Sequence, residues 1–306
     1  MRFAPAPSGL RTQSLLTPRI LGVFRQKKEV KSMKNSVWIH EMFWPDIEDH
    51  LAQGGDTVMV PIGATEQHGP HTALFVDTAW ASDVSEAVAE QENVLVSPPL
   101  HFGYSHHHLA FPGGITLRAE TLTQVALDVG ESFVSHGFKK IIFVNGNRIA
   151  NLPPLQIAMT KLRLRTGAFA AIIDTHLIAR SEVCAMADNA RDASNHAGDV
   201  ETSFMLHKHP HFVRTKEIAK LPERPLEPFS SVYPMDPPFD RNVAFTQTTP
   251  EEFLIKTGGT GVYSDPSRAT AEKGDRILKV TIRRAAEFVR YVKALDIQCQ
   301  KCPVPV

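Results

Sequence analysis

The sequence predicts an α/β fold built on a mainly parallel central sheet. Short apolar runs alternate with longer segments whose apolar residues recur at helical spacing, which is typical of repeated strand–helix units. Polar residues cluster where the apolar runs end, and α/β proteins tend to place their functional sites there. These patterned segments continue without a linker, so we expect a single domain over residues 36–295.

The strands are predicted from apolar runs that are too short for buried helices. The first run, Thr57 to Ile62, stops at Gly63. The other three runs span 93–96, 140–144 and 169–174.

The helices are predicted from alanine, valine and leucine residues that share one face. Gly137 and Gly167 follow two of these segments and favour helix ends there. The predicted helices span 78–91, 119–136, 153–165 and 267–295, and a further helix opens near Asp199.

The flanks of this domain differ in composition. Residues 1–32 carry many arginines and lysines but a single acid, which indicates a disordered extension, a start at Met33 instead, or a transit peptide. Residues 221–240 are rich in proline and predict a surface arm. Residues 296–306 form a tail, and its Cys299 and Cys302 lack the second pair that a zinc site needs.

Charge and cysteine content exclude several classes of protein. Acidic and basic residues balance at 33 each, which argues against a nucleic acid or anionic membrane partner. No segment of membrane-spanning length is free of charges. The chain has only 3 cysteines, which suits a reducing compartment, and we expect a cytoplasmic location.

The first candidate site follows the strand 57–62. Glu66 and His68 are two residues apart, so in an extended segment their side chains point the same way. Asp77 adds a carboxylate before the next helix, although an aspartate is also a good helix cap. One imidazole and two carboxylates form a plausible ligand set for zinc, manganese or iron.

Two further clusters carry histidines. Tyr104, Ser105 and the histidines 106–108 precede a Pro-Gly-Gly turn, and three adjacent histidines cannot all face one site. His196 precedes Asp199 and Glu201 at the start of a helix, where the helix dipole also favours carboxylates. A histidine beside carboxylates provides what a general acid or base needs.

Together these motifs resemble the creatininase family of metal-dependent amidohydrolases. The matching stretches occur in family order and are PIGATEQHGPH…VD, SHHHLAFPGGITL, VNGN…N, SNHAGDVETS and GVYSDPSRATAEKG. The resemblance implies a three-layer α/β/α sandwich, a small-molecule substrate and a homo-oligomer, often a hexamer. It also implies two divalent ions, of zinc, manganese or iron.

The resemblance further implies residue roles. Glu66 and His68 would each hold one ion, and Asp77 would bridge the two. A metal-bound hydroxide would attack the carbonyl of a cyclic amide or a related C–N bond. His196 would serve the proton transfers, and Glu201 would act as a ligand or orienting group.

The third strand departs from the family pattern. The family places a metal-ligating histidine where this chain has Asn147, and creatininases proper place a glutamate where it has Ile149. An amide oxygen is generally a weaker donor to zinc than imidazole. Creatinine is therefore a doubtful substrate.

Three interpretations of Asn147 stay open. In the first, the site keeps a metal with fewer protein ligands and uses His107 or His108. In the second, it carries a different metal. In the third, the chain is catalytically impaired. A non-catalytic binding or structural protein is one alternative to the hydrolase, and a lactone or cyclic ketone hydrolase is another. Residues expected to contact the substrate are Tyr104, Ser105, His108, Arg148 and Asp199.

Overall fold

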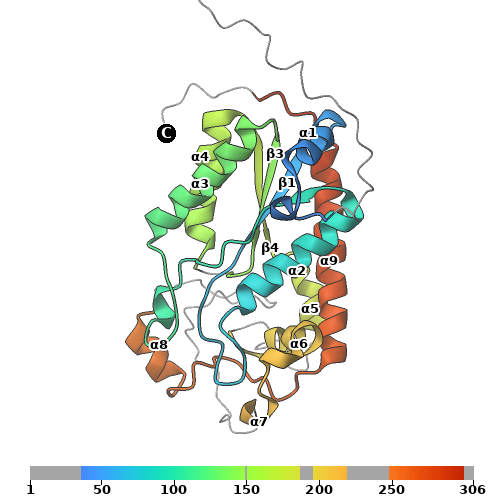
Figure 1. Cartoon of the computed structure of the whole chain (residues 1–306). Helices are drawn as coiled ribbons and strands as arrows, with labels where there is room; N and C mark the ends of the chain where they lie inside the picture. The colour runs from blue at the N-terminus through green and yellow to red at the C-terminus, as the bar shows by residue number, and fades with distance from the viewer. Residues whose placement is uncertain (1–35, 149, 187–195, 219–247, 300–306) are drawn as a thin grey trace, which may run out of the picture. The chain divides into compact units, whose positions relative to one another are not determined.

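The computed structural model describes residues 36–148, 150–186, 196–218 and 248–299 (Figure 1). Its central sheet is parallel throughout, with strand order β2-β1-β3-β4. The strands are β1 (Thr57–Ile62), β2 (Leu95–Val96), β3 (Lys140–Asn145) and β4 (Phe169–Asp174). The predicted α/β class with a parallel sheet is confirmed.

The sheet is covered by helices on both faces, as the buried side chains show. Val58, Val60 and Ile62 pack with residues of α3 (Ala119–Ser135) and α4 (Leu152–Thr166). Met59 packs in a second cluster with residues of α2 (Val76–Glu92), α6 (Asp199–Lys208) and α9 (Ala271–Lys293). Because strand side chains alternate between faces, one apolar strand supplies both clusters. The result is the three-layer α/β/α arrangement that the resemblance implies (Figure 1).

Smaller elements complete the described chain. The helices α1, α5, α7 and α8 and the short 3-10 helices η1, η2 and η3 connect or flank the layers. Their bounds are α1 (Trp44–Ala52), α5 (Arg180–Met186), α7 (Thr215–Ile218), α8 (Pro250–Lys256), η1 (Ile39–Glu41), η2 (His106–His108) and η3 (Pro210–Phe212).

Several predicted boundaries are wrong by a few residues. The last helix begins at Ala271 rather than 267, because Thr270 caps it by accepting a hydrogen bond from the Lys273 N–H. The second strand pairs only over Leu95–Val96, and the preceding Asn93 is a left-handed cap that ends α2. The sequence pattern did not predict α1, α5, α7 or α8.

Some expectations concern segments outside the described residues. These are the extension 1–32, the arm 221–240 and Cys302, so the predicted domain limits stay predictions. Among the described residues, no helix combines the length and the apolar character that crossing a bilayer requires.

Two glycines bring α2 against the strand ends. A Cβ atom on Gly63, just after β1, would lie 2.3 Å from the Thr78 backbone nitrogen. A Cβ atom on Gly146, just after β3, would lie 1.9 Å from the Asp77 backbone oxygen. Only residues without a side chain allow this approach. The first turn of α2, with Asp77, is thereby held at the carboxyl edge of the sheet.

Candidate metal centre

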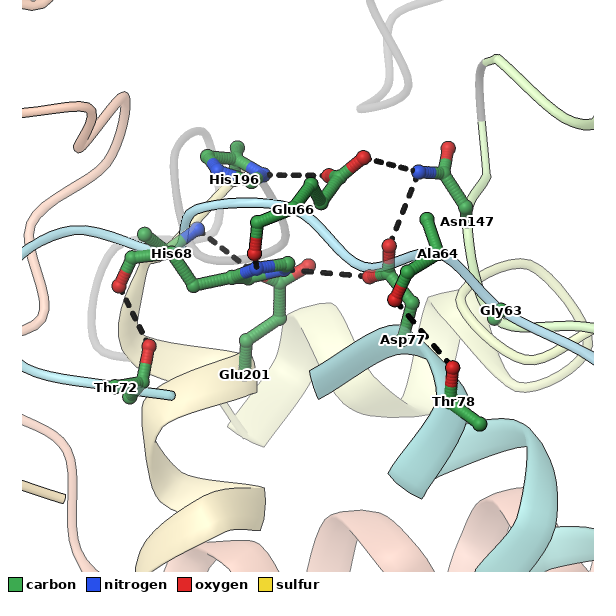
Figure 2. A network of polar contacts seen from close by, with 12 residues as sticks. Gly63, Ala64, Glu66, His68, Thr72, Asp77, Thr78, Asn147, His196 and Glu201 are labelled. Atoms are coloured by element: carbon green, nitrogen blue, oxygen red, sulfur yellow. Dashed lines mark hydrogen bonds and ion pairs between the residues drawn. The ribbon is translucent and has the colours of Figure 1, made fainter. Parts of the chain in front are cut away.

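The carboxyl edge of the sheet gathers a group of buried acids and histidines (Figure 2). Glu66 and His68 come from the segment after β1, Asp77 from α2 and Glu201 from α6. All four side chains are buried, and His68 is fully inaccessible to solvent. Burying this many ionisable groups is costly unless they are paired or hold an ion.

His68 faces two carboxylates. Its Nε2 lies 3.3 Å from Asp77 Oδ1 and 3.6 Å from Glu201 Oε2. The other ring nitrogen, Nδ1, lies 3.3 Å from the Glu66 backbone oxygen and donates to it. That hydrogen bond leaves the Nε2 lone pair directed at the carboxylates, as in metal-ligating histidines. Nε2 has no hydrogen-bond partner within the described part of the chain.

The His68, Asp77 and Glu201 group fits a divalent cation. The three ligand atoms lie within 4.8 Å of one another. Two ligands bound about 2.1 Å from one tetrahedral ion are separated by roughly 3.4 Å, which is close to the spacing found here. One imidazole and two carboxylates suit zinc, manganese or iron. A cation between His68 Nε2 and the two carboxylates would satisfy all three buried groups.

The electrostatics of the metal-free group show how strongly these side chains interact. Burial and the Glu66 charge raise the pKa of Asp77 to about 7. Burial also raises the pKa of Glu201 to about 7. Burial would lower the pKa of His68, but Asp77 and Glu201 raise it to about 10. A proton on His68 therefore takes the place of a cation when none is bound.

The carboxylate of Glu201 is positioned by Ala197 and His176. The Ala197 N–H donates to Glu201 Oε2 at 2.6 Å, and Ala197 adopts a left-handed φ of 58° that is uncommon for a residue with a side chain. His176 Nε2 lies 3.8 Å from Glu201 Oε1 and donates to the Gly146 backbone oxygen. Burial lowers the pKa of His176 to about 3, so it stays neutral.

His196 lies beside the group, with Nδ1 3.6 Å from Glu66 Oε1. The Gln67 amide has two hydrogens but three neighbours: His108 Nδ1 at 2.8 Å, His196 Nε2 at 2.9 Å and the Gly261 oxygen at 3.0 Å. His196 Nε2 also lies 2.6 Å from the Gln67 backbone oxygen, which can only accept. The consistent assignment makes His196 Nε2–H the donor, so its Nδ1 lone pair faces the site. Burial, followed by His108, holds the pKa of His196 well below its usual value.

The other expected residues divide into two sets. Ser105 Oγ donates to Glu66 Oε2, and His108 Nε2 lies 3.2 Å from Glu66 Oε1, so both belong to the group. The ring of Tyr104 stacks on His106, and its backbone N–H donates to Asn151 Oδ1. Asp199 is not brought into the group, because its carboxylate lies 2.7 Å from Lys273 Nζ and accepts from Ser203.

Arg148 differs from a typical surface arginine. It is only 9% exposed and lies where its charge acts on Asp174. Burial raises the pKa of Asp174 to about 6, while Arg148 and a hydrogen bond from Asn145 act against the rise. Arg148 thus supports a buried polar cluster behind the strand ends.

Sequence reasoning missed Gln67 and His176. Gln67 stands between the two expected ligands, where an alternating segment directs its side chain away from theirs. His176 follows β4 directly, so the rule that sites gather at strand ends could have found it.

The profile of the creatininase family, described as creatinine amidohydrolase, matches residues 40–289. The chain belongs to the creatininase family. Creatinine amidohydrolase of Pseudomonas putida is 28% identical over 84% of this chain and 98% of that protein. The mycofactocin precursor peptide peptidase of Mycolicibacterium smegmatis is 30% identical over 76% of this chain and 84% of that protein.

Solved creatininase structures share the fold. The crystal structure of creatinine amidohydrolase has a TM-score of 0.68 and 26% identity, and the match covers 86% of this chain and all of that one. A manganese creatininase and a mutant described as Zn-Zn type each reach a TM-score of 0.67. The three-layer fold is that of the creatininases.

Proposed function

We propose that this protein is a metal-dependent hydrolase that cleaves a C–N bond in a cyclic amide or a related small molecule. The observation that carries the proposal is the buried His68, Asp77 and Glu201 group, in which His68 Nε2 faces both carboxylates and makes no hydrogen bond with the described residues. Two of the relatives, a creatinine amidohydrolase and a peptide peptidase, are named for cleaving C–N bonds.

A bound divalent cation polarises a carbonyl and activates water. The chain's own residues supply the rest. His196 is neutral and presents the Nδ1 lone pair beside Glu66, so it can take up a proton and return it to a leaving nitrogen. Gln67 fixes the ring orientation through the backbone oxygen that accepts from Nε2.

The ring of His196 also bounds the space in which a substrate binds. It stacks on His108 and lies edge-on to Phe253 of α8, with ring centroids 4.2 and 5.8 Å away. The aromatic rings on this side of the site favour a flat group, such as a small lactam ring, over an extended peptide. We expect Ser105, Tyr104 and His108 to contact that group.

The proposal is tested by metal removal followed by a substrate screen. A chelator should lower the melting temperature, because a cation that binds only the native state stabilises it. The protein is then reloaded with metal and assayed on cyclic amides, formamides, short peptides and lactones. Metal-dependent turnover of a cyclic amide supports the proposal. If only lactones or only peptides are turned over, the proposed class of substrate is wrong and that class takes its place.

A non-catalytic binding protein is the second candidate, and Asn147 is the observation that favours it. A melting temperature that is unchanged by chelator, together with no bound metal, would establish that candidate instead. The cytoplasmic location and the homo-oligomer stay predictions.

A further inference from the structure

The side-chain amide of Asn147 lies between two carboxylates of the metal centre. Asn147 Nδ2 is 2.7 Å from Glu66 Oε2 and 3.0 Å from Asp77 Oδ2, and it donates to both (Figure 2). Asn147 is only 6% exposed. The amide hydrogens therefore occupy the position from which a cation would contact Glu66 and Asp77 together.

The orientation of this amide is fixed by its surroundings. Asn147 Oδ1 accepts from the Ala150 N–H at 3.3 Å, two residues before α4 begins. The Asn147 backbone is held as well, because its N–H donates to Asn145 Oδ1 and its oxygen accepts from Asn145 Nδ2. Turning the amide over would place its oxygen against two carboxylates and its NH2 against the Ala150 N–H. Both contacts would be repulsive.

Glu66 is already surrounded by donors. Ser105 Oγ donates to Oε2, as does Asn147. His108 Nδ1 accepts from the Gln67 amide, so its Nε2 carries the proton and donates to Glu66 Oε1 at 3.2 Å. A carboxylate that accepts three such hydrogen bonds is satisfied without an ion.

The surroundings of His68 differ from those of Glu66. His68 Nε2 makes no hydrogen bond of good geometry with the described residues, but it lies 3.3 Å from Asp77 Oδ1 and 3.6 Å from Glu201 Oε2. Asp77 thus directs one oxygen to the Asn147 amide and the other to His68. Glu66 also forms a candidate ligand group with His68 and His196, whose ligand atoms lie within 4.8 Å of one another. Glu66 Oε2, however, already accepts from Ser105 and Asn147, so the residues fit a cation at His68, Asp77 and Glu201 better than one at Glu66.

We infer that this chain is a one-ion member of its family, in which His68, Asp77 and Glu201 hold a single divalent cation and the Asn147 amide replaces a second. The inference rests on the proposed function for the existence of a bound cation. It goes beyond that function by assigning Glu66 to hydrogen bonding rather than to metal binding.

The test counts ions without measuring turnover. Protein is loaded with excess Mn²⁺, freed of unbound metal by gel filtration, and examined by plasma mass spectrometry and electron paramagnetic resonance. We expect one Mn²⁺ per chain and the spectrum of an isolated ion in the unaltered protein. Asn147→His should bind two and show an exchange-coupled spectrum. Ser105→Ala also removes a donor from Glu66 but adds no ligand, so it should still bind one.

Two more variants keep the test decisive if Asn147→His does not fold. Glu66→Gln should retain one Mn²⁺, whereas His68→Ala should retain none. Two coupled ions in the unaltered protein would overturn the inference and leave the proposed function intact. No ion would overturn both. One ion in folded Asn147→His, or loss of the ion in folded Glu66→Gln, would overturn the role given to Asn147 or to Glu66.

Discussion

The backbone oxygen of Asp77 lies where a side chain on Gly146 would begin. The separation from an added Cβ atom would be 1.9 Å, which no real contact of this kind shows. Relief requires the start of α2 to move away from the end of β3, and Asp77 moves with it. The position of Asp77, a proposed metal ligand, is therefore set by a glycine that follows a different strand.

Gly146→Ala should accordingly be strongly destabilising. We expect a loss of about 3 kcal/mol in the free energy of unfolding, the upper range for overpacking a core. Urea denaturation measures this loss. Gly114→Ala is the matched control, because the nearest atoms to its added methyl group lie 3.8 Å away, and it should change stability by less than about 0.5 kcal/mol. Equal stabilities for the two variants would contradict the packing argument.

Cation binding should release protons. Asp77 and Glu201 have pKa values of about 7, and His68 of about 10, so protons must leave before these groups bind a metal. Affinity for Mn²⁺ should rise about tenfold or more for each pH unit between pH 6 and 8. Isothermal titration calorimetry in buffers of different ionisation enthalpy measures both effects. A pH-independent affinity would show that these side chains are not the ligands.

Removing the central imidazole should abolish metal binding. His68→Ala eliminates the only nitrogen in the His68, Asp77 and Glu201 group, and leaves two adjacent carboxylates without a cationic partner. We expect no retained metal and no effect of chelator on the melting temperature. His136→Ala, an exposed position on the far end of α3, should behave like the unaltered protein. Retained metal in His68→Ala would place the ion elsewhere.

The buried Asp199–Lys273 pair should contribute to stability and not to metal binding. Both side chains are 6% exposed, so Asp199→Asn leaves Lys273 as a buried cation with a lost partner. Breaking such a pair costs about 3–5 kcal/mol. Lys279 pairs with Asp275 on the surface, and Lys279→Ala should cost less than about 1 kcal/mol. If Asp199→Asn folds but no longer binds metal, Asp199 does take part in metal binding and this prediction is wrong.

His71 should make stability depend on pH. Burial, followed by the His68 charge, lowers its pKa to about 4, so the unfolded chain binds more protons than the native chain between pH 4 and 6.5. Stability from this group is present above pH 6.5 and falls by about 3 kcal/mol as the pH drops to 4. His71→Gln can keep a hydrogen bond to Thr202 and should show a shallower decline in urea titrations over that range. An unchanged slope would assign the decline to other groups.

Much of the fold follows from the sequence because strands and helices differ in period. The runs at β1, β3 and β4 are apolar throughout, and only a strand buried on both faces needs that pattern. The helices α1 and α8 were missed for a related reason. Each has one buried or partly buried face against a neighbour, but short helices carry too few residues to show a period.

The site was less predictable than the fold. Glu66, His68 and Asp77 share one segment, and local spacing indicates that they converge. The direction in which Asn147 presents its amide depends on Ala150, Glu66 and Asp77 together, and no local pattern encodes that. Asp199 was expected to contact the substrate, but in the structure its carboxylate pairs with Lys273, which belongs to a helix far along the chain.

The order of the ligands along the chain has a consequence for local unfolding. Glu66 and His68 follow β1 and Asp77 begins α2, whereas Glu201 is carried by α6, which packs on α9. A cation held by both groups would add a link between α6 and the strand ends beyond their shared apolar core, and its removal should allow α6 to open locally more often. Amide hydrogens of α6 would then exchange faster in the metal-free protein, while those of β1 and β3 keep their protection. The proposed ion would therefore link two parts of the fold as well as take part in the reaction.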